Sequence, residues 1–296
     1  MNEILYASAK GISQAIQDKK VSALEVVEAH LRRIEEVNPK LNAVVHLASD
    51  RALSEAKRAD SAMAKGESTG ILHGLPMTVK DSHDAQGLVS TGGTKGRETF
   101  VPESDATAVS RMRSEGAIVL GKTNTPELTL AFETDNLIYG RTNNPYNLDR
   151  TPGGSSGGAG AIIASGGSPV DLGTDTGGSV RVPSGFCGIS GLKPTSGRVP
   201  RTGHIISHSL GAIDSLTTVG PMARFVEDLT MVYPIISGPD WIDPAIVPMA
   251  LGNPDDVDIK QLRVAYFTDI GNIASPGQIV AVIKSAATAL KDRGAY

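Results

Sequence analysis

The segment 153–195 reads GGSSGGAGAIIASGGSPVDLGTDTGGSVRVPSGFCGISGLKPT and holds the pattern that decides the fold. Its apolar residues 159–164 predict a short helix, and Pro169-Val170-Asp171-Leu172 predicts a strand directly after it. Glycine-serine clusters lie on both sides of this helix and strand. Flexible linkers are also rich in glycine and serine, but they lack such apolar, patterned sequence between the clusters. We therefore expect two ordered loops within an α/β unit.

Helix and strand patterns alternate along the rest of the chain. Ser22-Ala23-Leu24-Glu25 is a capping box and predicts a helix that runs to Asn38-Pro39. The segment 74–80 predicts a strand that enters the core and ends at Lys80, where open α/β sheets place active sites. We expect an α/β fold, with helices covering a twisted sheet. The further predicted elements are helices over 50–64, 105–113 (capped by Asp105) and 277–293, and strands over 117–120 and 262–267.

No linker or repeat divides the chain, which predicts a single domain over 1–296. Its N-terminal helical part covers about 1–65, and its catalytic α/β core covers about 66–296. The final residues 292–296 look like a helix stop followed by the start of another strand. A sheet that stopped there would leave an unpaired edge and an uncovered apolar face. We therefore expect a truncated or cleaved product.

Composition narrows the classes of function. The 296 residues carry a formal net charge of −4 and no long Lys/Arg block, which argues against a nucleic-acid or anionic-membrane partner. No apolar run reaches the length of a membrane span, and the N-terminus lacks a secretory signal pattern. The single cysteine, Cys187, excludes an internal disulfide and fits a reducing compartment. We expect a cytoplasmic protein that acts on small molecules, with a homodimer as an open alternative to a monomer.

The chemistry of the glycine-serine clusters favours hydrolysis. A serine that attacks an amide needs a base, a proton donor for the leaving nitrogen and N–H groups aimed at the developing oxyanion. The glycines in the segment 176–179 allow consecutive N–H groups to converge on one oxygen. Histidine is scarce near the clusters, so Lys80 is the better base candidate, provided that burial lowers its pKa from about 10.4. That requires Asp81 to point away or to be paired elsewhere.

Three glycine-rich stretches carry a resemblance to a known family, and they cover residues 153–158, 173–181 and 186–195. Shorter matches lie in 74–81, 121–124 and 142–145, in the family's order and separation. On these residues the chain resembles the amidase signature family over most of its length. The resemblance implies the family's α/β fold, a twisted mixed sheet covered by helices on both faces, with the C-terminal part of the family domain missing here.

The resemblance also implies a catalytic triad. Ser179 is then the nucleophile that forms an acyl-enzyme, Ser155 is the relay, and Lys80 is the base that starts neutral. In such enzymes the peptide bond from Gly154 to Ser155 is cis. Ser155 later donates a proton to the departing nitrogen.

The resemblance to this family implies further residue roles. The oxyanion hole consists of the backbone N–H groups of Thr176, Gly177, Gly178 and Ser179. Ser156 supports its loop through hydrogen bonds. Asp175 and Arg181 brace the nucleophile loop as a charged pair.

Competing motifs lack the context that each requires. Residues 153–157 match G-x-S-x-G, but the polar segment before them is not the buried strand that a nucleophile elbow needs, and 190–193 match S-x-x-K without its companion motifs. His204 and His208 have a zinc-binding spacing, but Ile205 replaces the glutamate that would act as base. We therefore expect no metal and no cofactor. The same two histidines and His83 are candidates for the substrate mouth, and Cys187 is a small packed residue.

The sequence thus predicts a serine hydrolase that cleaves C–N bonds of small uncharged amides or carbamates, a range that could include esters and urethanes. One alternative is the A subunit of a glutamyl-tRNA amidotransferase, which releases ammonia from glutamine. Its usual Arg-Gln-Pro-Ala is replaced here by Arg181-Val182-Pro183-Ser184, which argues against it. The other alternative is an inactive truncated fragment that acts only as a binding module.

Overall fold

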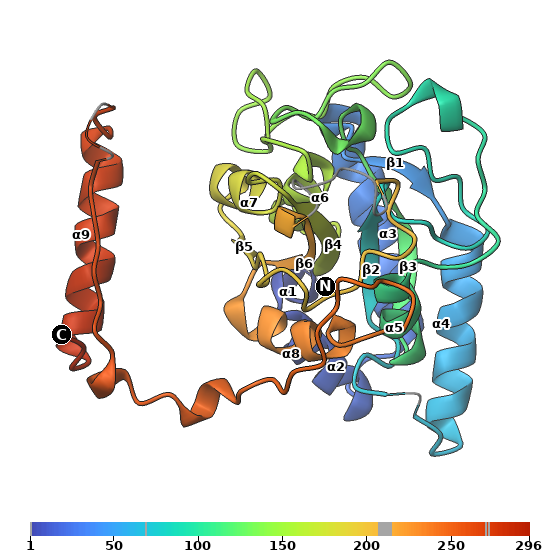
Figure 1. Cartoon of the computed structure of the whole chain (residues 1–296). Coiled ribbons are helices and arrows are strands. Elements are labelled where there is room, and N and C mark those ends of the chain that lie inside the picture. The colour runs from blue at the N-terminus through green and yellow to red at the C-terminus, as the bar shows by residue number, and fades with distance from the viewer. Residues whose placement is uncertain (1, 69, 207–214, 270, 272) are drawn as a thin grey trace. The chain divides into compact units, whose positions relative to one another are not determined.

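The computed structural model describes residues 2–68, 70–206, 215–269, 271 and 273–296 (Figure 1). It divides into two compact units, Met1–Met249 and Ala250–Tyr296. The predicted site residues all belong to the first unit, except that His208 lies outside the described residues. The expectation of a single domain stays a prediction.

A six-stranded sheet runs through the first unit, in the order β1-β3-β2-β4-β6-β5. The central strand β2 (Pro76–Lys80) is parallel to both of its neighbours, β3 (Ile118–Thr123) and β4 (Val170–Asp175). The outer strands pair antiparallel with their neighbours, so the sheet is mixed, as predicted. These outer strands are β1 (Val44–Leu47), β5 (Ser190–Gly191) and β6 (Thr218–Ala223).

Helices cover both faces of this sheet (Figure 1), which confirms the predicted fold class. The buried residues form two apolar clusters, because each face of the sheet is closed by its own set of helices. One cluster contains residues of α2, α5 and α8, and the other residues of α3, α4 and α6. The α-helices of this unit are α1 (Asn2–Tyr6), α2 (Ala9–Gln17), α3 (Ala23–Leu41), α4 (Ser49–Ala64), α5 (Thr107–Ser114), α6 (Gly157–Ala164), α7 (Arg181–Cys187) and α8 (Val226–Ile236).

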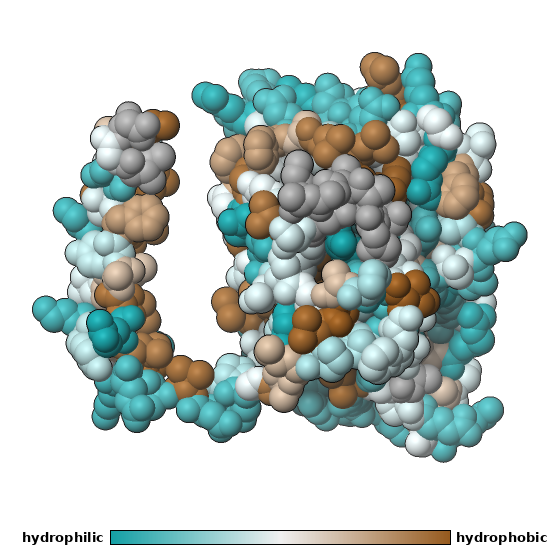
Figure 2. All heavy atoms as spheres, viewed as in Figure 1, coloured by the Kyte–Doolittle hydropathy of each residue, from teal (hydrophilic) through white to brown (hydrophobic). Residues whose placement is uncertain are grey.

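The second unit holds the helix α9 (Gly277–Asp292), close to the predicted helix. The predicted strand over 262–267 is not assigned there. Instead, Val264 N–H donates to the carbonyl oxygen of Tyr296 and Tyr296 N–H donates to that of Leu262. Large apolar side chains of this unit are exposed, and Figure 2 shows hydrophobic surface along it. Phe267, for example, is 73% exposed.

Local signals predicted some helix ends and missed others. The capping box at Ser22 and Glu25 is present, but α3 continues through Pro39 to Leu41, where Asn42 ends it in the left-handed conformation. The predicted cap of α5 is wrong. The Asp105 carboxylate instead accepts from Gln86 N–H and lies 3.4 Å from the Arg113 guanidinium, and α5 has no side-chain cap. Long-range partners therefore outweigh the local capping preference at this residue.

Gly158 lies where α6 approaches the loop after β3. A methyl group on its Cα would lie 2.4 Å from the backbone N of Asn124 and 2.6 Å from the carbonyl oxygen of Ala43. Both neighbours are backbone atoms, so they cannot move aside as a flexible side chain would. This close approach places the start of α6 against the C-terminal end of the sheet.

Gly158→Ala is expected to lower the free energy of unfolding by about 3 kcal/mol, because the added methyl overpacks this contact. Gly185→Ala is the matched control, since Gly185 also lies in a helix and nothing would touch its added Cβ within 4 Å. Helix propensity alone should leave that variant as stable as the parent or more stable by up to about 1 kcal/mol. Urea denaturation of both variants measures the difference, and equal midpoints would contradict the close approach.

Candidate active site

Lys80 ends the central strand and is completely buried. Its ammonium or amine nitrogen, Nζ, lies 2.7 Å from Ser155 Oγ and 2.9 Å from Thr174 Oγ1. Both hydroxyl groups are buried as well. The structure thus joins two of the three predicted catalytic residues by a hydrogen bond between segments 75 residues apart in sequence.

Burial also changes the proton affinity of Lys80. Removal from water disfavours the charged form and lowers the pKa of Lys80 to about 7. The negative charges of Asp171 and Asp175 oppose this shift, because they favour the charged form. A lysine with this pKa is largely uncharged at slightly alkaline pH. Its amine can then accept a proton from the hydroxyl group that it contacts.

The Ser155 loop connects to the Ser179 loop through the neighbouring residue, Ser156. The Gly154–Ser155 peptide is cis. Ser156 N–H donates to the carbonyl oxygen of Ser179 at 3.1 Å, and Ser156 Oγ lies 3.4 Å from both the backbone N and the carbonyl oxygen of Thr174. Ser156 is therefore placed to fix the spacing between the two loops.

Asp175 organises the Ser179 loop. Its buried carboxylate accepts from the N–H groups of Gly178, Val180 and Arg181, at 2.9, 3.0 and 3.3 Å. The Arg181 guanidinium donates to both carboxylate oxygens, at 2.9 and 3.0 Å. These partners hold the pKa of Asp175 below its usual value against the opposing effect of burial, so the carboxylate stays charged.

These contacts show which of the four N–H groups expected in the oxyanion hole are free to bind an oxyanion. Gly178 N–H donates to Asp175, so this structure does not leave it available for an oxyanion. Within the described residues, the N–H groups of Thr176, Gly177 and Ser179 have no hydrogen-bond acceptor. The same three residues line one cavity. The geometry thus favours Thr176, Gly177 and Ser179 as the donors of such a hole.

The cavity beside Ser179 has a volume of about 380 Å³. Its wall is mainly apolar and comes in part from the loop after β3. None of the described residues that line it carries a full charge, since His204 is buried and its pKa is lowered to about 3. They are Thr129, Leu130, Ala131, Phe132, Thr176, Gly177, Ser179, His204, Ile206 and Thr217.

The two described candidate histidines lie side by side. The rings of His83 and His204 pack edge to face, with centroids 5.4 Å apart, and both side chains are buried. Burial lowers the pKa of each, so both rings are neutral. His204 reaches the cavity, whereas His83 is not among its lining residues.

Comparison with known proteins bears on this geometry. The profile of the amidase family matches residues 25–296. The chain belongs to the amidase family. Its sequence is 38% identical over 295 residues to the A subunit of a glutamyl-tRNA(Gln) amidotransferase from Sulfurihydrogenibium, and the match covers 99% of this chain and 60% of that protein.

Solved amidase structures share the fold. A fatty acid amide hydrolase superposes with a TM-score of 0.91 at 29% identity, over 99% of this chain and 52% of the other. A 6-aminohexanoate cyclic dimer hydrolase superposes with a TM-score of 0.87 at 33% identity, over 98% and 60%. The chain thus spans about half to three fifths of the length of these relatives.

Two absences concern the described part of this amidase-family chain. Its helices include none that is long and apolar enough to cross a membrane. Among the residues with described positions, no three His, Cys, Asp or Glu side chains are grouped as they would be around a metal ion.

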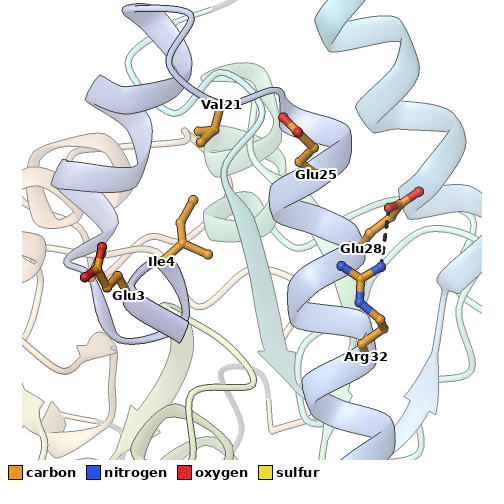
Figure 3. Close-up of a pocket in the computed structure, with 7 residues that line it drawn as sticks. Glu3, Ile4, Val21, Glu25, Glu28 and Arg32 are labelled. Carbon is orange, nitrogen blue, oxygen red and sulfur yellow. Dashed lines mark hydrogen bonds and ion pairs between the residues drawn. The ribbon is translucent and has the colours of Figure 1, made fainter. Parts of the chain in front are cut away.

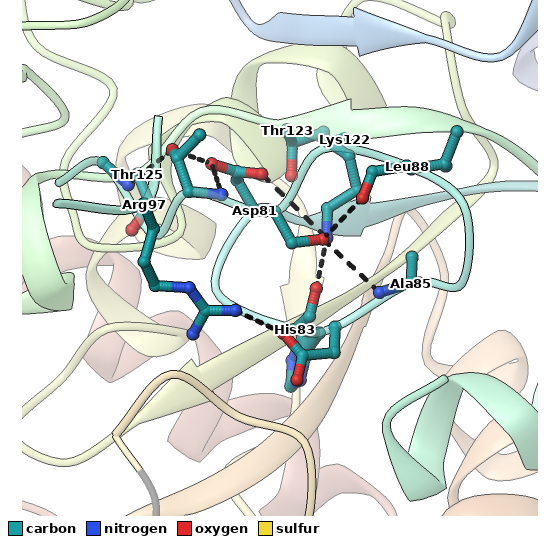
Figure 4. Close-up of polar contacts among 12 residues, drawn as sticks. Asp81, His83, Ala85, Leu88, Arg97, Lys122, Thr123 and Thr125 are labelled. Carbon is teal, nitrogen blue, oxygen red and sulfur yellow. Dashed lines mark hydrogen bonds and ion pairs between the residues drawn. The ribbon is translucent and has the colours of Figure 1, made fainter. Parts of the chain in front are cut away.

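A second buried lysine, Lys122 on β3, fixes the loop that follows Lys80 (Figure 4). Its Nζ donates to the carbonyl oxygen of His83 and, at 3.0 Å, to Ser90 Oγ, and it lies 4.0 Å from the Asp81 carboxylate. Asp81 also accepts from Thr91 N–H at 3.1 Å. Asp81 is therefore paired away from Lys80, which meets the condition set by the sequence.

Another cavity, of about 630 Å³, lies on the first unit between α1, the start of α3 and the segment that joins α2 to α3 (Figure 3). Its wall carries Glu3, Glu25 and Glu28, and Arg32 lies 3.4 Å from Glu28. It shares no residue with the cavity beside Ser179. It offers no nucleophile, so we place the chemistry beside Ser179.

Some residues of the site were missed from the sequence. Thr174 contacts Lys80 directly, and Thr217 Oγ1 lies 2.8 Å from Thr176 Oγ1. Thr174 lies inside the Gly173–Arg181 motif, so the motif itself was the available signal. Asp171 enters the sequence prediction only as part of an apolar strand, although a carboxylate inside a buried strand is itself a signal of function.

Proposed function

We propose that this chain carries the active site of a serine hydrolase that cleaves C–N bonds of small uncharged amides or carbamates. The observation that supports it most strongly is the buried contact of 2.7 Å between Lys80 Nζ and Ser155 Oγ. Burial lowers the pKa of Lys80 to about 7, and the lysine contacts a buried serine hydroxyl. Such a lysine is suited to act as a general base. The proposed nucleophile is Ser179, at the wall of the apolar cavity.

In the proposed mechanism, neutral Lys80 takes the proton of Ser155 as Ser155 takes the proton of Ser179. The Ser179 oxygen then attacks the substrate carbonyl carbon, and the carbonyl oxygen becomes an oxyanion. The N–H groups of Thr176, Gly177 and Ser179 stabilise that charge. Ser155 next donates its proton to the leaving nitrogen and Lys80 returns one to Ser155, after which water hydrolyses the acyl-Ser179 ester.

Asp175, Arg181 and Ser156 are proposed to position these groups without touching substrate. Asp175 holds three successive parts of the Ser179 loop through N–H groups. Arg181 neutralises that carboxylate from a partly exposed position, 54% exposed at its side chain. Ser156 connects the loop to the segment that bears Ser155.

The cavity supports a preference for uncharged substrates. Its described wall offers apolar side chains and hydroxyl groups but no full charge. An uncompensated charge removed from water costs several kcal/mol. A neutral acyl group therefore fits this wall better than a zwitterion does.

A second candidate function is ammonia release from glutamine within an amidotransferase. The 38% identity to the A subunit of such an enzyme favours it. Two features favour the stand-alone hydrolase. One is the Arg181-Val182-Pro183-Ser184 segment, and the other is that the described residues of the cavity wall offer no charged partner for the α-carboxylate and ammonium of glutamine. We therefore rank the hydrolase first.

The pH dependence of kcat/KM for a neutral anilide tests the role of Lys80. The rate should rise with pH through about 7, because only neutral Lys80 accepts the proton, and should level off above that. Lys80→Met should lower kcat by about 10³-fold and remove the rising limb. Lys122→Met is the matched control, since it removes another buried lysine on the adjacent strand and should leave the limb in place. A Lys80→Met enzyme of near-parental rate would contradict the proposed base.

A substrate panel separates the two candidate functions. The chain should hydrolyse a neutral anilide, primary amide or carbamate with a kcat/KM at least about 10²-fold above that for glutamine, because glutamine brings two charges to an uncharged wall. Rates are measured with and without charged tRNA and amidotransferase partner subunits. Glutamine hydrolysis that depends on those partners, without anilide hydrolysis, would reverse the ranking. Hydrolysis of neither class would favour the binding-only fragment.

A further inference from the structure

A buried carboxyl group that the proposed mechanism does not use lies beneath Lys80. Asp171 is completely buried in β4, directly opposite Thr78 of β2. Its Oδ2 accepts from Thr78 Oγ1 at 2.6 Å and from Thr123 Oγ1 at 3.0 Å. Charged residues inside a central strand are rare because burial without a partner is costly.

The two threonines place this carboxyl group across the central strand. Thr78 is two residues before Lys80 on β2, and Thr123 is paired with Lys80 from β3. Since β2 lies between β3 and β4, the contact between Asp171 of β4 and Thr123 of β3 is made over β2, with the two side chains reaching it from opposite sides. Asp171 is therefore held next to the stem of the proposed base.

The second carboxyl oxygen, Oδ1, is buried and has no hydrogen-bond partner among the described residues. A fully satisfied structural carboxylate would have donors on both oxygens. Burial raises the pKa of Asp171, while the hydroxyl groups of Thr78 and Thr123 and the backbone of Lys80 favour its ionised form through hydrogen bonds. Lys80 is the cation that favours its ionised form.

We propose that Asp171 is a positioning residue for the proposed base, and that its charge sets the protonation of Lys80 and hence the pH at which the Ser155 relay operates. This inference rests on the proposed function of Lys80. When Asp171 is ionised, its negative charge favours protonated Lys80 and so makes the lysine a stronger base than burial alone would leave it. A base with too low a pKa removes the proton of the nucleophile less effectively. The higher pKa that Asp171 gives Lys80 therefore favours nucleophilic attack.

Other titratable groups act on the same pair. Asp175 at the end of β4 favours protonated Lys80, while Lys80 itself lowers the pKa of both His83 and His204. Asp171 in turn raises the pKa of Lys122. Burial raises the pKa of Asp171 and lowers the pKa of Lys80, and each charged group favours the charged form of the other, so their titrations are coupled.

Replacement of the carboxyl group tests the inference. Asp171→Asn keeps the shape and a hydrogen-bonding oxygen but removes the charge, so the rising limb of kcat/KM for the anilide should move about 1 pH unit toward acid. The plateau rate should fall as well, because Lys80 becomes a weaker base. A merely structural role would lower the plateau without moving the limb, and that result would overturn the inference.

Asp228→Asn is the matched control. Asp228 is another buried carboxylate, on α8, and accepts from the backbone N–H of Lys10 far from Lys80 in the sequence. That variant should lose stability but keep the parental limb. If it moved the limb as far as Asp171→Asn does, the shift would not report on Lys80.

Two further measurements test the role of Asp171 if Asp171→Asn fails to fold. Asp171→Ser is smaller and still offers Thr78 and Thr123 an oxygen, and it should show the same acid shift. With ¹⁵Nζ-labelled lysine, the Lys80 resonance should titrate about 1 pH unit lower in Asp171→Ser than in the parent chain, and equal titration midpoints would overturn the inference. Absence of anilide hydrolysis by the parent would instead refute the proposed function.

Discussion

The burial of Lys80 against Ser155 is the constraint on which the rest of the site depends. A lysine in water is almost wholly protonated at neutral pH and cannot serve as a base. Here the side chain is fully enclosed, and desolvation brings its pKa to about 7. The hydroxyl groups of Ser155 and Thr174 are its hydrogen-bond partners. The two apolar clusters on either face of the sheet exclude the water that would otherwise restore the charge.

The position of β2 explains how distant segments meet at this lysine. Because β2 is central and parallel to β3 and β4, the carboxyl ends of these three strands lie at one edge of the sheet. Lys80, Thr123 and Thr174 come from those three ends. The tight approach of Gly158 to the loop after β3 then sets α6, and with it the Ser155 loop, against the same edge. The fold thus places these residues close together, and burial lowers the pKa of Lys80 so that it can accept a proton.

Much of this arrangement could be predicted from the sequence, and the exceptions have physical causes. The helix–strand alternation predicted the α/β architecture, since hydrophobic periodicity is local information, and the family resemblance predicted the mixed sheet. The predicted cap of α5 was wrong because Asp105 pairs with Arg113 and with Gln86 N–H. The predicted strand over 262–267 is not assigned in the structure. The use of Gly178 N–H by Asp175, and the contact of Asp171 with Thr123 over β2, depend on three-dimensional contacts that no motif spacing encodes.

Covalent trapping tests whether Ser179 is a nucleophile that buried Lys80 activates through Ser155. The folded chain is treated with a fluorophosphonate, its intact mass is measured, and the modified residue is located by peptide mapping. The account predicts a single adduct on Ser179, lost in Ser179→Ala and formed far more slowly in Lys80→Met. An adduct on another serine, or an unmodified chain that still hydrolyses amides, would contradict it.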